Sequence, residues 1–266
     1  MSVTREEAIK LYGWKALPVE PTLKLWLGDK KFLTAPVPQL CSQVPLPDTS
    51  VVKACVEYAK AELPEHIFNH SMRVFYYGMA ISGQQFPDWE FTAETWLLTC
   101  LFHDIGAVDK HTHGTFMSFE FFGGILALDV LKQKKAPVAQ AESIAEAIIR
   151  HQDSAEVGTI TTIGLLIQLA TQFGTLLLVS PCASELALLS NARVDNMGFR
   201  SELVHPDTIV DVTKNYPRRN WSKCFSTKIR EENDVKPWAH STAIGFDEFP
   251  DSVKNNSLME PYDAKF

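Results

Sequence analysis

The sequence predicts an all-α protein in which a single helical bundle follows an irregular N-terminal arm. Hydrophobic residues make up 45% of the 266 residues, and apolar side chains recur at intervals of three and four from residue 50 onward. No stretch of useful length alternates between apolar and polar residues, and no segment repeats. We therefore expect one helical domain over residues 49–245, an arm over 1–48 and a C-terminal tail over 246–266.

The arm is expected to be irregular because six prolines break any long helix between residues 18 and 47. A short helix near residues 23–27 is the single exception. From residue 47 the sequence Pro-Asp-Thr-Ser supplies good helix caps, and a helical pattern begins. We expect helices over residues 50–61, 65–84, 93–103, 115–132, 138–151, 162–173, 207–216 and 220–232.

Charge and cysteine content exclude several classes of protein. The formal net charge is −7, whereas nucleic-acid-binding proteins usually present a basic face. The five cysteines are widely spread without a CxxC pair, which is typical of a reducing compartment. Neither a secretory signal nor a membrane-spanning stretch is predicted. We expect a cytoplasmic protein with a small-molecule substrate and no nucleic-acid or membrane partner, and the sequence leaves a homo-oligomer open.

The sharpest local signal is His103-Asp104-Ile105-Gly106, where a histidine and a carboxylate adjoin at the end of a helix. This helix is apolar nearly all round, which indicates central burial, and Gly106 ends it. Two adjacent side chains at such an end can reach one ion, because the chain turns away there. Buried charged groups need partners, and a divalent metal suits both side chains.

Two further histidines are expected to point inward from neighbouring helices. His70 lies on the apolar face of its helix, and His151 closes the helix that carries Ile144 and Ile148 on the same face. Helical bundles build metal sites from side chains that project into the core in this way. A hydrogen-bonded core residue is the alternative for any single histidine, but three histidines and an aspartate from three helices favour a metal site.

An ordered set of motifs resembles the HD superfamily of metal-dependent phosphohydrolases, whose signature is H…HD…D. Within that group the chain closely resembles the fungal cyanamide hydratases, over most of its length from about residue 50. The resembling segments are NHSMRVF (69–75), TCLFHD (99–104), MSFE (117–120), GGI (123–125), AEAIIRH (145–151), 164–171, YPR (216–218), KPW (236–238) and His240, preceded by YGW (12–14) and Leu17-Pro18.

The resemblance implies an all-α HD-domain fold, a single zinc ion, and addition of water across the C≡N bond of cyanamide to give urea. His70, His103 and Asp104 match the first three metal positions of the family. The fourth family ligand is an aspartate in a sequence like Ala-Thr-x-x-Asp-Asn-x-Gly. Two imidazoles and two carboxylates would also suit iron or manganese. Zinc is preferred, because hydration needs no redox chemistry and the family implies zinc.

The chain departs from the family pattern at the fourth ligand. Ala170 and Thr171 are followed by an apolar insert over residues 174–194, and only then by Asp195-Asn196-Met197-Gly198. Deleting the insert restores the family motif, so Asp195 is the predicted fourth ligand. The insert begins with Gly-Thr, as translation through an intron donor site would, and an unspliced intron and a genuine loop are both open interpretations. Sequencing the transcript distinguishes them.

Further residues are candidates for proton transfer or substrate contact. His151 is placed by its helix to carry a proton between water and the substrate nitrogen. Glu120 and Lys110 are weaker candidates for proton transfer or for supporting the ligands, and a surface helix carboxylate would explain Glu120 nearly as well. Trp238 and His240 are candidates to line the pocket, with C-terminal packing as the alternative.

Three other functions compete with cyanamide hydration. An isocyanide also has a linear, electrophilic carbon and would give a formamide, and the size of the pocket decides between these substrates. An HD-type phosphohydrolase would need basic residues near the metal, for which Arg73 and Arg150 are the candidates. An inactive metal-binding protein is the third alternative, because the insert interrupts the ligand motif.

Overall fold

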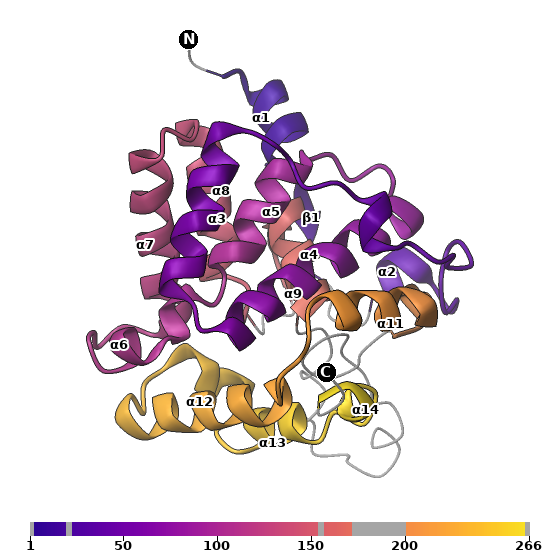
Figure 1. The fold of residues 1–266 in the computed structure, drawn as a ribbon. Coiled ribbons are helices and arrows are strands. Elements are labelled where there is room, and N and C mark those ends of the chain that lie inside the picture. Colours follow the sequence, from indigo (N-terminus) through magenta and orange to yellow (C-terminus); the bar gives the residue numbers. More distant parts are fainter. Residues whose placement is uncertain (1–2, 20–22, 154–156, 172–200, 264–266) are drawn as a thin grey trace.

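The computed structural model describes residues 3–19, 23–153, 157–171 and 201–263, and Figure 1 shows their arrangement. Helices dominate the fold, as predicted, and the all-α class is confirmed. A short antiparallel pair of strands, β1 (Ala16–Pro18) and β2 (Thr159–Thr161), is the one sheet of these residues, with Leu17 opposite Ile160. Three-residue strands carry too little alternation to be predicted from sequence. None of the helices described is both long and apolar enough to cross a membrane.

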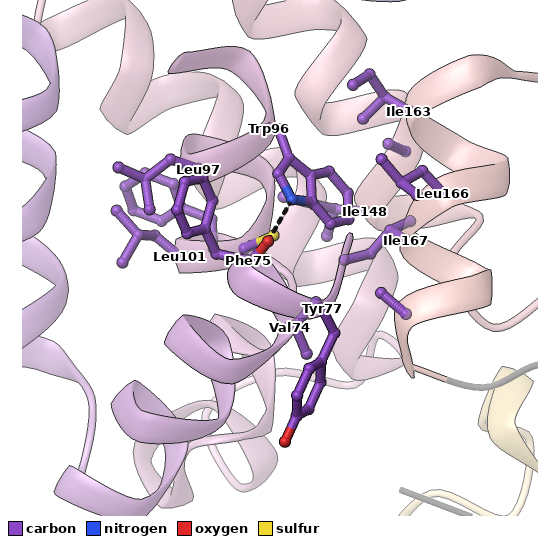
Figure 2. Close-up of a cluster of buried hydrophobic side chains, with 14 of the residues drawn as sticks. Val74, Phe75, Tyr77, Trp96, Leu97, Leu101, Ile148, Ile163, Leu166 and Ile167 are labelled. Atoms are coloured by element: carbon purple, nitrogen blue, oxygen red, sulfur yellow. Dashed lines mark hydrogen bonds between the residues drawn. The ribbon is translucent and has the colours of Figure 1, made fainter. Parts of the chain in front are cut away.

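The centre of the bundle is α5 (Ala93–Phe102), packed against α4 (Glu65–Gln85), α8 (Val138–Ile149) and α9 (Thr162–Thr171). From Thr95 onward every residue of α5 is buried, which confirms its predicted central place. Figure 2 shows Trp96 of α5 among apolar side chains of α4, α8 and α9, where its indole Nε1 donates to the Phe75 carbonyl at 3.0 Å. Gly78 permits this packing, because a Cβ there would lie 2.2 Å from the Trp96 ring. The core therefore holds the end of α5 in a fixed place.

The remaining helices of the bundle surround this centre. The helix α3 (Ser50–Glu62) begins at Thr49, whose side chain accepts from the Val52 N–H. After α5 the chain continues through a 3-10 turn, Ile105–Ala107, and one short helix. The outer members are α3, α6 (Asp109–Thr112) and α7 (Phe119–Gln133).

The arm contains a helix that the hydrophobic pattern does not predict. The helix α1 (Arg5–Tyr12) begins at a capping box, in which Thr4 and Glu7 each accept from the backbone N–H of the other. Its C-terminal end is fixed to the bundle, since Ser143 donates to the Tyr12 carbonyl at 2.6 Å. A second short helix, α2 (Lys24–Leu27), lies where the sequence predicts it. The arm is thus docked at both its helices, and Leu27 is buried.

The C-terminal region forms a layer along one end of the bundle. Figure 1 shows α12 (Trp221–Val235) and α13 (Glu248–Lys254) side by side there, with α14 (Glu260–Asp263) at the end of the same layer. The helix α11 (Pro206–Asn215) packs on α4 and leads into this layer. Residues 246–263, expected as a tail, contribute three fully buried side chains, Phe249, Val253 and Met259. The tail is therefore part of the folded domain.

Candidate metal centre

Three of the four predicted metal ligands converge inside the bundle. His70 lies in the second turn of α4, while His103 and Asp104 directly follow the last residue of α5. The Nε2 atoms of His70 and His103 are 3.0 Å apart, and the Asp104 Oδ2 atom is 3.4 Å from the first and 3.2 Å from the second. All three side chains are buried. Two imidazole nitrogens and one carboxylate oxygen therefore face the same point.

The ring of His103 is oriented by the helix that it ends. Its Nδ1 is 2.8 Å from the Cys100 carbonyl oxygen, which can only accept, so Nδ1 carries the proton. Carbonyl groups in the last turn of a helix have no partner within the helix, and this bond supplies one. The Nε2 lone pair of His103 is consequently left to face His70 and Asp104, as a metal ligand requires.

Asp104 is a buried carboxylate surrounded by three imidazole rings. Neither of its oxygens accepts a hydrogen bond from the part of the chain described. Burial by itself raises the pKa of Asp104, but the neighbouring imidazoles, with His103 foremost, outweigh it and bring the pKa below its ordinary value. A charged carboxylate with two open oxygens is costly in a protein interior unless a cation compensates it. This donor set of nitrogen and oxygen atoms fits a divalent metal ion.

His151 lies beside the three converging residues, at the end of α8. Its Nδ1 donates to the Ile148 carbonyl at 2.6 Å, so it is oriented by the same local device as His103. Its Nε2 is 3.7 Å from Asp104 Oδ1 and makes no hydrogen bond within the described part of the chain. The adjacent Gln152 is fully buried, and both its amide atoms also lack a partner among the residues described. Open polar atoms on His151, Gln152 and Asp104 are what a small polar substrate or water molecules would satisfy.

The ring of His70 is held by an aromatic side chain that sequence reasoning missed. Trp221, the first residue of α12, stacks on the imidazole with ring centroids 4.1 Å apart and an angle of 12° between the planes. The expected helix 220–232 contains this tryptophan, but no local pattern connects it to a histidine some 150 positions earlier. Only the tertiary fold brings the two rings together.

The buried Glu120 of α7 pairs with the partly buried His240 of the C-terminal layer. The Nδ1 of His240 is 2.8 Å from Glu120 Oε1, and its Nε2 is 3.6 Å from Asp153 Oδ1. The hydrogen bond to Glu120 raises the pKa of His240 against the opposing effect of burial. Since Glu120 is fully buried, its alternative role as a surface carboxylate is wrong. The outer Oε2 atom of Glu120 has no partner among the residues described.

A second buried acid joins α7 to α12. Glu232 Oε1 accepts from the Phe119 N–H at 2.8 Å, at the start of α7, and lies 3.2 Å from the Lys236 ammonium. Burial, and next the charge of Glu120, raise the pKa of Glu232 to about 7. Phe119 in turn packs edge-on against the ring of His151. The C-terminal layer therefore contacts the centre through Phe119 as well as through Trp221.

Comparison with known proteins places this centre in a family. A model of the HD domain matches residues 67–173, a range that contains His70, His103, Asp104 and His151. The cyanamide hydratases DDI2 and DDI3 of Saccharomyces cerevisiae are each 38% identical to the chain over 248 residues, which cover 93% of this chain and 97% of either relative. The chain belongs to the cyanamide hydratase family. The resemblance stated from the motifs is thereby confirmed.

The other predicted residues of this family member lie away from the converging ligands or outside the described ranges. Lys110 forms an ion pair with Glu62 at the surface, and more than half of its side chain is exposed. Trp238 is 58% exposed and donates to the Phe116 carbonyl, so packing at the surface explains it better than a pocket. Asp195 and the 174–194 insert lie outside the described residues.

Proposed function

We propose that the chain hydrates cyanamide to urea, using one zinc ion held by His70, His103, Asp104 and Asp195. The observation that carries the proposal is the convergence of two imidazole nitrogens and the Asp104 carboxylate inside the bundle, where neither carboxylate oxygen accepts a hydrogen bond from the described residues. The names of the two yeast relatives, which the chain matches over nearly its whole length, support the reaction. Zinc is favoured over iron or manganese because hydration requires no change of redox state.

The reaction joins the oxygen of water to the nitrile carbon of cyanamide, while the nitrile nitrogen gains a proton, and tautomerisation gives urea. A divalent ion at this position would lower the pKa of water toward about 7 and polarise the nitrile nitrogen. His103 and Asp104 contribute a fixed geometry, because the Cys100 carbonyl holds the imidazole and burial at the end of α5 holds the carboxylate.

His151 is the residue best placed to move the proton. Its Nδ1 proton is committed to the Ile148 carbonyl, so Nε2 presents a lone pair within 3.7 Å of Asp104. This nitrogen can take a proton from the attacking water and return it to the substrate nitrogen, so that no net proton is consumed. Gln152, which follows in sequence, has a buried amide N–H that could donate to the nitrile nitrogen and a buried amide oxygen that could accept from the amino group of a small substrate.

The basic residues near the ligands are engaged in ways that disfavour a phosphohydrolase. Arg73 is fully buried and donates to the carbonyl groups of Tyr216 and Pro217. Arg150 pairs with Asp153 at 2.7 Å and donates to the Thr159 carbonyl. Neither guanidinium group is free to clamp a phosphate, whereas cyanamide is neutral and needs no such clamp.

The proposal includes a cytoplasmic enzyme that acts on a small molecule. The cysteines described, Cys41, Cys55, Cys100 and Cys224, are free thiols, which supports a reducing compartment. The net charge of −7 supports the absence of a nucleic-acid partner. A homo-oligomer is compatible with the proposed reaction, which needs only the ligands of one chain.

The test is a substrate panel with a matched variant. The zinc-loaded protein is incubated with cyanamide, with an isocyanide and with a nucleotide, and urea, formamide and phosphate are measured. We expect urea from cyanamide only, and no activity in His103→Ala, because that variant loses one ligand. Urea formation that persists in His103→Ala would refute the site, and formamide or phosphate as the main product would refute the substrate.

A further inference from the structure

The ring of His70 is the end of an aromatic column built by the C-terminal layer. Trp221 lies parallel to it, and Phe225, one turn later in α12, lies parallel to Trp221 at 5.0 Å and 14°. Phe249 of α13 meets Phe225 edge-on at 6.4 Å. All four side chains are buried. The column therefore runs from the metal centre to a segment whose sequence predicts only a tail.

The turn that delivers Trp221 is held by the helix that carries His70. Asn69, the neighbour of His70, donates to the Pro217 carbonyl at 3.0 Å. Arg73, nearly one turn further along α4, donates to the carbonyl groups of Tyr216 and Pro217. The side chains that flank His70 thus fix the chain just before α12. The position of the Trp221 indole relative to the His70 imidazole is therefore set by hydrogen bonds between α4 and the residues just before α12.

The turn itself adopts a costly backbone conformation. Arg219 and Asn220 both have positive φ angles, +53° and +58°, which non-glycine residues rarely adopt. Asp263 of α14 stabilises this turn twice, because its carbonyl accepts from the Asn220 N–H at 2.8 Å and its carboxylate accepts from Arg218 Nε at 2.7 Å. Such strain persists only where the surroundings determine it, and here it aims the first side chain of α12 at His70.

We propose that Trp221 is the positioning residue of His70, fixing the plane of the imidazole so that Nε2 faces the metal ion. This inference rests on the proposed metal site. The χ2 torsion of histidine is broad, and a metal ligand must be held to a narrow range of orientations. His103 and His151 are held by carbonyl groups at helix ends, whereas a parallel indole face restricts the rotation of a ring inside a helix.

The test measures metal binding in Trp221→Leu and Trp221→Phe, without reference to turnover. Zinc affinity is determined by competition with a chromophoric chelator, and the cobalt-substituted protein is examined for its visible d–d absorption, which reports ligand geometry. We expect Trp221→Leu to raise the zinc Kd by about 10- to 100-fold, the usual range for residues that orient a ligand. Trp221→Phe, whose smaller ring still overlaps the imidazole, should raise the zinc Kd less. Its cobalt spectrum should lie between those of the wild type and Trp221→Leu.

Trp89→Leu is the matched control. Trp89 stacks on Phe86 at 4.3 Å and 12°, nearly the geometry of the Trp221 pair, but this stack involves no metal ligand. Its loss should lower the Tm and leave the zinc Kd unchanged.

A folded Trp221→Leu protein that binds zinc as tightly as the wild type would overturn the inference. If that variant does not fold, a Trp221→Phe protein with wild-type Kd and cobalt spectrum would overturn it equally. A wild-type protein that binds no zinc would instead overturn the proposed function.

Discussion

The two sides of the candidate metal centre orient their imidazoles by different means. At the ends of α5 and α8, His103 and His151 each donate a hydrogen bond from Nδ1 to the carbonyl three residues earlier. Inside α4, where the carbonyl groups are engaged in helix hydrogen bonds, His70 is stacked on Trp221 from a distant helix. A histidine at a helix end can thus be oriented locally, whereas one inside a helix needs a tertiary partner.

His151→Gln should reduce the rate of urea formation most, because it removes the group proposed to transfer the proton without removing a proposed metal ligand. We expect kcat for urea formation to fall by about 10²- to 10⁴-fold, the usual contribution of a general acid–base residue. Zinc content should stay at the wild-type level. Steady-state kinetics and metal analysis of the same preparation check this, and a variant that instead loses its zinc would identify His151 as a ligand.

Asp263→Ala should show how far the stacking of Trp221 on His70 depends on the contacts that support the turn before α12. The substitution removes the Asp263 carboxylate from the buried Arg218 guanidinium and with it a support of the strained turn. We expect a loss of roughly 1–3 kcal/mol in the free energy of unfolding, within the range for losing the charged partner of a buried group. Urea denaturation measures it. The zinc Kd should also rise in this variant. An unchanged Kd would mean that Trp221 keeps its position without the Asp263 carboxylate.

The pH dependence of the free energy of unfolding tests the junction of α7 and α12, where Glu232 is buried. Folded Glu232 keeps its proton up to about pH 7, whereas the unfolded chain releases it near its ordinary pKa of 4.5. The native state therefore binds more protons in this window, and this group makes the free energy of unfolding fall as the pH rises through it.

Glu232→Gln should make that fall shallower, because the amide still accepts from the Phe119 N–H but does not titrate. Thermal unfolding of both proteins from about pH 5 to about pH 8 measures the difference in slope. Parallel Tm profiles for the two proteins would show that Glu232 titrates normally.

The parts of the site that depend on nearby residues are the parts that the sequence can predict. The helix before His103 ends within one residue of its expected position, and the spacing of apolar residues places His70 on a buried face. By contrast, α7 begins at Phe119 and not near 115, because its first N–H is satisfied by Glu232, more than a hundred residues away. No local pattern contains that partner.

The same limit explains the other differences. The β1 and β2 strands pair residues that lie more than 140 positions apart. The C-terminal tail gains its helices by burying Phe249 and Met259 in the layer beside α12, and its short length gives a weak helical pattern. The sequence leaves a surface role open for Glu120 because carboxylates are mostly exposed, and its partner His240 lies 120 residues later.

The most direct test of the central claim is the metal content of the purified chain, compared between the wild type and Asp104→Asn. The substitution keeps the shape of the side chain and removes the charge that balances the ion. We predict one zinc ion per wild-type chain, loss of that zinc in Asp104→Asn, and loss of urea formation when a chelator strips the wild type. A wild-type protein without stoichiometric metal, or with turnover unaffected by chelation, would contradict the account.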